Sequence, residues 1–157
     1  MSCKLSTLVN LRTIFFNTNI LQRVKSSLKR LKMSKTFNLK YFKISEFDSP
    51  DEPGSGDKMD KNFLEKLDYA RGIAGIPFTI NSGYRTENYN NNVLGARVGS
   101  SHCKGLAADI RAIGSRDRSL IIQALISVGI NRIGIANTFI HCDVDKDKDQ
   151  DVIWLYN

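Results

Sequence analysis

SGYRTENYNNNVLGARVGSSHCKGLAAD, residues 82–109, contains His102, one of only two histidines in the chain. Asp109 follows seven residues later, with small residues between the two. The second histidine, His141, lies downstream in the apolar run FIHCDVD. Two imidazoles and one carboxylate can hold a zinc ion and leave one position open for water. Spacing alone is a weak signal, because a histidine and an aspartate at this separation also occur as ordinary surface or core residues.

Segments typical of β-strands surround this stretch and continue to the end of the chain. The segment LAADIRA alternates apolar residues with Asp109 and Arg111, which is the period of a strand. Apolar or alternating runs bounded by turn residues predict strands at 77–82, 106–112, 132–136, 139–144 and 152–156. Residues 83–101 are rich in Gly, Asn and Ser and predict an irregular loop, where functional side chains often lie.

Two helices are predicted from apolar residues that recur at helical spacing. The first spans about residues 58–72, with Asp57 as its cap, and the second spans residues 115–128. Residues 38–47 alternate enough to predict a short strand or an extended segment. Together these elements predict an α+β domain, with a small, mainly antiparallel sheet and flanking helices packed against it.

The composition is that of one ordinary globular domain. The 157 residues are 41% hydrophobic and 25% charged, and no apolar run is long enough to span a membrane. The net charge of +7 is unevenly distributed, because residues 1–45 hold ten Lys or Arg and no acid precedes Glu46. The remainder has thirteen basic and sixteen acidic residues, a net charge of −3. We therefore expect no nucleic acid as a partner of the folded domain. Separately, we expect the domain to be a monomer.

We interpret residues 1–36 as a basic N-terminal extension and residues 37–157 as the folded domain. Residues 1–32 contain Ser, Leu, Ile and Phe but no acids, as do organellar transit peptides and disordered basic arms. A third interpretation is favoured: an extension of the gene model upstream of a start at Met33. The reason is that a compact domain begins naturally near residue 37. No clear secretory signal is recognised, so the sequence predicts no localisation.

The three cysteines, Cys3, Cys103 and Cys142, give no disulfide framework, because their number is odd and their spacing does not repeat. A reducing compartment is the simplest interpretation. A bridge between Cys103 and Cys142 remains open, because each follows a histidine of the candidate site.

The acidic run DVDKDKDQD, residues 143–151, alternates acids in the manner of a calcium-binding loop. Its sixth position is Lys148 instead of glycine, and its twelfth would be Trp154 instead of glutamate. The EF-hand pattern therefore fails, and we interpret the run as a solvated turn.

Two motifs and a later histidine carry a resemblance to a known family. SGYRT (82–86) and SSHCKGLAADI (100–110) resemble the zinc D-Ala-D-Ala carboxypeptidases and the related L-alanyl-D-glutamate endopeptidases, which cut peptidoglycan stem peptides. The family signature is S-G-Y-R, then S-x-H-x-x-G-x-A-x-D, then a histidine on a strand. The resemblance covers residues 38–157, and its motifs are specific in combination. The matching residues are Ser82, Gly83, Tyr84, Arg85, Asn91, Gly95, Ser100, His102, Gly105, Ala107, Asp109 and His141.

This resemblance implies a fold, a cofactor and an activity. The fold would be the zinc fold of the hedgehog and D-Ala-D-Ala peptidase type, as in short, single-domain, phage-type members. One zinc ion would be held by His102, Asp109 and His141, and Arg85 would bind substrate and stabilise the transition state. The reaction would be hydrolysis of a stem-peptide bond by a zinc-activated water, in the manner of an endolysin at the bacterial cell wall.

The general base is where this chain departs from the family. Many relatives carry a carboxylate three residues before the last histidine, or a histidine two before it. Here these positions are Thr138 and Phe139. Asp143 is our candidate base, because alternation along a strand places it on the same face as His141. An equally good alternative is that Asp143 orients His141 instead of acting as a base. For the domain as a whole, the alternative function is a non-catalytic, zinc-containing module that binds peptidoglycan.

Overall fold

The structure is a computed structural model that describes residues 37–93 and 98–156. The predicted extension at residues 1–36, with Cys3, and the motif residue Gly95 lie outside the described residues. No helix in the described ranges is both long enough and apolar enough to cross a membrane.

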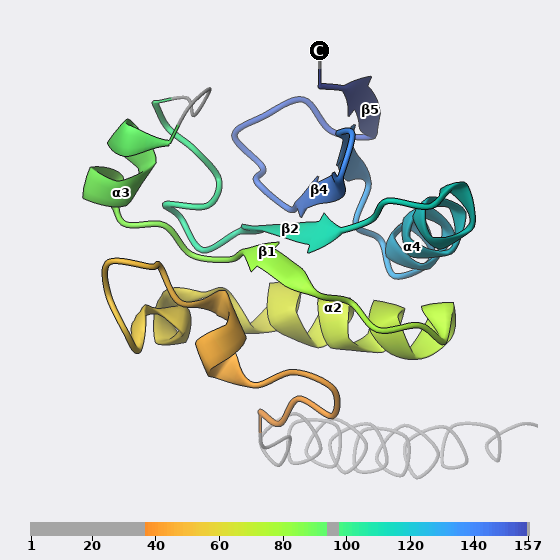
Figure 1. The fold of residues 1–157 in the computed structure, drawn as a ribbon, viewed down its shortest axis with the longest axis horizontal. Coiled ribbons are helices and arrows are strands. Elements are labelled where there is room, and N and C mark those ends of the chain that lie inside the picture. The colour runs from red at the N-terminus through yellow and green to blue at the C-terminus, as the bar shows by residue number, and fades with distance from the viewer. Residues whose placement is uncertain (1–36, 94–97, 157) are drawn as a thin grey trace, which may run out of the picture. The chain divides into compact units, whose positions relative to one another are not determined.

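A five-stranded sheet with the order β1-β2-β4-β3-β5 carries the fold (Figure 1). Its strands are β1 (Ile80–Ser82), β2 (Ala107–Arg111), β3 (Arg132–Ile135), β4 (Phe139–Asp143) and β5 (Val152–Leu155). Neighbouring strands are antiparallel except β3 and β5, which are parallel. The predicted α+β class and mainly antiparallel sheet are therefore confirmed, although β1 is shorter than the predicted strand.

One face of the sheet is apolar and forms part of the core. Helices α2 (Lys61–Ala74) and α4 (Ser115–Ser127) pack against each other, and α4 also contacts β4. Burying one large aliphatic or aromatic side chain in this core stabilises the folded state by about 1.5–3 kcal/mol. On this face, the strand side chains with no measurable exposure are Ala108, Ile110, Ile133, Ile140 and Cys142. Because successive strand residues face opposite sides, Asp109 and His141 lie on the other face.

Helix α2 begins and ends slightly later than predicted. Its N-cap is Asp60, whose carboxylate accepts a hydrogen bond from the backbone N–H of Phe63 at 2.8 Å. The prediction that Asp57 caps this helix is wrong, because Asp57 lies in a short 3₁₀ helix, η2 (Ser55–Lys58). Helix α4 starts at the predicted residue and ends one residue early.

The segment at residues 38–47 is not a strand. Its second half is a 3₁₀ helix, η1 (Ile44–Phe47). The Glu46 side chain accepts a hydrogen bond from the backbone N–H of Lys43 at 2.8 Å, which closes this turn.

The loop predicted at residues 83–101 contains a short helix, α3 (Glu87–Asn92). Thr86 caps it, because the Thr86 hydroxyl accepts a hydrogen bond from the backbone N–H of Tyr89 at 3.0 Å. The cap satisfies one of the N–H groups that every helix start leaves without an internal partner. The prediction of an irregular loop is therefore wrong for these residues.

Candidate metal centre

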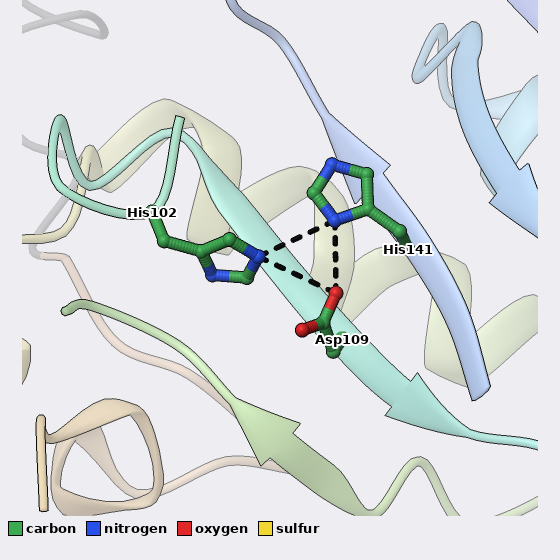
Figure 2. A group of neighbouring side chains, drawn as sticks. All are labelled: His102, Asp109 and His141. Carbon is green, nitrogen blue, oxygen red and sulfur yellow. Dashed lines mark hydrogen bonds and ion pairs between the residues drawn. The ribbon is translucent and has the colours of Figure 1, made fainter. Parts of the chain in front are cut away.

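Sheet register brings two residues of the candidate site together. Asp109 of β2 and His141 of β4 are directly paired across the two antiparallel strands. Directly paired residues project from the same face, so these side chains meet on the polar side of the sheet. His102 comes from the turn that precedes β2 and points toward the same place (Figure 2).

Three ligand-type atoms converge at this point: Nε2 of His102, Oδ1 of Asp109 and Nδ1 of His141 (Figure 2). The His141 nitrogen lies 2.8 Å from the Asp109 oxygen. The His102 nitrogen lies 3.3 Å from each of the other two atoms. The exposed fractions of the three residues are 3%, 6% and 7%, so the cluster is almost closed to solvent.

The outer nitrogen of each histidine is already occupied. Nδ1 of His102 donates to the carbonyl oxygen of Gly83 at 2.7 Å. Nε2 of His141 lies 3.0 Å from Oδ2 of Asp143, to which it donates. A neutral imidazole carries one proton, so each ring then turns an unprotonated nitrogen toward the centre. This pairing of an outer N–H with a carbonyl or carboxylate is typical of metal-binding histidines.

The turn that carries His102 depends on Gly105. Its backbone has φ 69°, and its N–H donates to the carbonyl of His102 at 3.1 Å. A Cβ at this position would collide with the carbonyl oxygen of Lys58. Any other residue would therefore meet both a left-handed backbone and a steric clash. This explains the glycine three residues after the histidine.

Protonation states in the cluster follow from burial and from these contacts. Burial lowers the pKa of His102, and the hydrogen bond with Asp109 does not restore it. Burial alone would raise the pKa of Asp109, but hydrogen bonds with the two histidines hold it below its usual range. Burial would lower the pKa of His141, yet its contacts with Asp109 and Asp143 raise it. A neutral His102 beside an ionised Asp109 is the state in which both can bind a metal.

Arg85 lies at the edge of the cluster and holds the second oxygen of Asp109. Its Nη2 donates to Oδ2 of Asp109 at 2.7 Å, and its Nε donates to the hydroxyl of Ser82 at 2.7 Å. The backbone N–H of Arg85 also donates to the carbonyl of His102 at 3.3 Å. The guanidinium is thus fixed beside the centre, where a positive charge can face a substrate anion.

Asp143 contacts the outer nitrogen of His141, lies outside the group of three convergent atoms and has both oxygens engaged. Oδ2 faces His141, and Oδ1 accepts from Nε of Arg132 at 2.8 Å and from the N–H of Asp145 at 3.0 Å. Only 1% of Asp143 is exposed. Of the two roles considered for Asp143, this geometry favours orienting His141 over taking a proton from water.

Asp145 is a supporting residue that the sequence did not indicate. It is buried and accepts hydrogen bonds from the hydroxyl of Ser101 at 2.9 Å and from Nζ of Lys104 at 3.0 Å. Both donors lie in the turn around His102. The interpretation of residues 143–151 as a solvated turn is therefore wrong at its start, where Asp143 and Asp145 are buried.

The cysteines beside the two histidines are free thiols. Cys103 and Cys142 form no disulfide with each other, so the possible bridge is absent. The Cys142 thiol contacts the carbonyl oxygen of Ala108 at 3.5 Å, on the core side of the sheet. Burial raises the pKa of the Cys142 thiol, which keeps it protonated and unreactive.

The donor set fits zinc. Two imidazole nitrogens and one carboxylate oxygen are its usual protein ligands, and three of them leave a position for water or substrate. When both imidazoles are neutral and keep their outer N–H groups, the three inner atoms, 2.8–3.3 Å apart, can all turn a lone pair toward one point. A metal ion bound there would displace the protons that otherwise form hydrogen bonds among these atoms. In the described part of the chain, these residues are the one group found that could hold a metal.

Comparison with known proteins agrees with this chemistry. A family model described as Peptidase M15 matches residues 40–143, which include Arg85 and the three converging residues. Strand β5 lies beyond the matched residues. No curated protein matches the chain. The family match covers most of the described residues, and it confirms the resemblance seen in the motifs: the chain belongs to the Peptidase M15 family, the zinc-dependent peptidases of the D-Ala-D-Ala carboxypeptidase type.

Proposed function

We propose that residues 37–157 form a zinc peptidase domain that hydrolyses a peptide bond in peptidoglycan stem peptides, either D-Ala-D-Ala or L-Ala-D-Glu. The observation that carries this proposal is the convergence of three buried ligand atoms. In each of the three residues, the second nitrogen or oxygen of the side chain is hydrogen-bonded to a further group of the protein. Membership of Peptidase M15 supports the zinc peptidase class. Stem peptides are the substrates that the resemblance implies.

The chain's own residues would bind and orient the reacting groups. His102, Asp109 and His141 would hold one zinc ion, which when bound supplies a Lewis acid and an activated water. Arg85, fixed by Ser82 and Asp109, would face the substrate carboxylate or the negative charge that develops on the attacked carbonyl oxygen. The low exposure of the cluster strengthens this electrostatic stabilisation, because few water molecules compete for the same groups.

A direct test combines metal analysis with a digest of defined stem peptides. We expect the purified protein to contain one zinc ion per chain and to release a single pair of fragments, identified by mass spectrometry. A chelator should stop the cleavage, and added zinc should restore it. Protein that holds no zinc and releases no fragments would overturn the proposal.

Asp143→Asn separates the two roles of this carboxylate. We propose that Asp143 orients His141, so the variant should bind zinc about 10- to 100-fold more weakly, as expected when an outer partner is lost. Activity should return when zinc is saturating, because the three ligands remain. If Asp143 were instead the general base, added zinc would not restore kcat. Asp117→Asn, on the exposed surface of α4, is the matched control and should leave both quantities unchanged.

A non-catalytic binding module is the second candidate. The observation that favours it is that Asp143 is engaged by the outer nitrogen of His141, together with Thr138 and Phe139 where relatives carry a proton acceptor. Wild-type protein that contains zinc and binds cell-wall fragments without cutting them would establish this function instead.

A further inference from the structure

A single row of paired residues connects the candidate metal centre to the last strand. Asp109 pairs with His141, His141 pairs with Gly134, and Gly134 pairs with Trp154. Members of such a row project from the same face of the sheet. The indole of Trp154 therefore lies on the site face, with its ring centroid 5.6 Å from that of His141.

Tyr156 places a second aromatic ring beside the same histidine. Its backbone N–H donates to the carbonyl of Ile135 at 2.9 Å, which continues the pairing beyond the end of β5. Its ring centroid lies 6.3 Å from that of His141 and 6.2 Å from that of Trp154. Tyr156 is 44% exposed, so much of the phenol is accessible to a ligand.

Gly134 makes room for both rings. A Cβ at this position would lie 2.5 Å from Cε2 of Tyr156 and 2.7 Å from Cε2 of Trp154. Such contacts are far shorter than van der Waals packing allows, so only glycine lets the two rings lie over β3. Arg132 also contacts the indole, with its guanidinium carbon 5.3 Å from the ring centroid. The same Arg132 binds Asp143, the partner of His141.

The row also gives the site two chemically different ends. Ser82 of β1 pairs with Asp109, and Arg85 binds both of these residues, so a cation lies at the β1 end. The β5 end carries the two aromatic rings. A ligand that spans the centre would meet a positive charge on one side and flat apolar surfaces with a phenol on the other. An anionic group at one end and a small uncharged group at the other complement this arrangement.

We propose that Trp154 and Tyr156 form an aromatic wall of the substrate site and contact the small, uncharged part of the peptide beside the scissile bond. This inference rests on the proposed peptidase function. It adds a substrate-contacting segment that lies beyond the residues matched by the family model. Trp154 and Tyr156 select substrate by apolar contact, and the Tyr156 hydroxyl supplies a donor for a backbone carbonyl. They take no part in holding the metal.

The test uses the full chain and two variants, Trp154→Phe and Tyr156→Ala, with Leu155→Ala as the matched control. Leu155 belongs to the same strand but is 70% exposed and projects from the opposite face. We expect Tyr156→Ala to raise KM for a stem peptide about tenfold, and Trp154→Phe to raise it less, because Phe keeps part of the apolar surface. Zinc content should equal that of the wild type in all three variants.

A binding measurement gives a second readout that does not depend on turnover. Trp154 is the only tryptophan of the chain, so its fluorescence reports directly on this wall. A stem peptide whose scissile amide is replaced by a reduced, uncleavable bond should shift the emission of the wild type and of Leu155→Ala. Tyr156→Ala should need about tenfold more peptide for the same shift, consistent with the loss of one aromatic contact.

The outcomes separate this inference from the function on which it rests. Wild-type protein that cuts no stem peptide would overturn the proposed function. Wild-type protein that cuts, while KM and peptide binding are unchanged in Trp154→Phe and Tyr156→Ala, would overturn only the aromatic wall. Loss of zinc from either variant would show that the rings support the metal centre instead of the substrate.

Discussion

His102→Ala is expected to remove zinc from the protein and to abolish peptidase activity. The change deletes one of three ligand atoms and leaves Oδ1 of Asp109 and Nδ1 of His141, 2.8 Å apart, as the remaining pair. Loss of an outer partner such as Asp143 is expected to weaken zinc binding about 10- to 100-fold. Loss of a ligand itself should weaken it far more. Zinc content after dialysis and kcat/KM on a stem peptide are the two measurements.

The matched control is Cys103→Ala, in the same turn. Cys103 is a free thiol outside the group of converging atoms, so this variant should retain zinc and activity. His102→Ala also loses the hydrogen bond to the carbonyl of Gly83, which should cost about 0.5–1.5 kcal/mol of stability. A folded His102→Ala protein that keeps the wild-type zinc stoichiometry would show that the metal is held elsewhere.

Part of this site follows from the sequence because strands have a fixed period. Alternation places Asp109 opposite its apolar neighbours on one strand, and places His141 and Asp143 on one face of another. The structure agrees, since Asp143 contacts His141 and the intervening Cys142 faces the core. The alternation of side chains along one strand does not determine which other strand pairs with it. The pairing of Asp109 with His141 therefore had to be taken from the structure.

Features set by distant partners could not be predicted from local pattern. Asp145 lies in an acidic run that favours a solvated turn, yet it is buried because Lys104 and Ser101, more than forty residues earlier, supply its donors. The aromatic rings of β5 reach the site because that strand pairs in parallel with β3, a non-local arrangement. The sequence predicted the last strand but gave no reason to place Trp154 beside a histidine.

Helix α3 was missed for a different reason. Its sequence, ENYNNN, is rich in asparagine, which is a poor helix former, and six residues are too few for a helical period to show. The helix depends instead on the Thr86 cap and on hydrogen bonds outside the segment. Thr86 also donates from its hydroxyl to Asp51, which anchors the start of α3 to the turn before η2.

Arg85→Lys is expected to reduce kcat/KM by about 10²- to 10³-fold, the usual effect of losing one donor to a developing oxyanion. Lysine keeps the positive charge but has no planar fork, so it cannot hold the Ser82 hydroxyl and Oδ2 of Asp109 while also facing substrate. At saturating zinc the protein should still hold about one ion per chain, because all three ligand residues remain although Asp109 loses an outer partner. Steady-state kinetics at saturating zinc, with metal analysis of the same sample, measure both quantities.

The comparison of zinc content with rate decides what Arg85 does. If its role were only to hold Asp109, activity would fall in proportion to zinc, and excess zinc would restore it. If Arg85 acts on the transition state, the loss in kcat persists when every site is filled, because the missing interaction forms only as charge develops on the substrate. Arg111→Lys, at the exposed end of β2, changes the same residue type on the strand that carries Asp109 and should alter neither quantity.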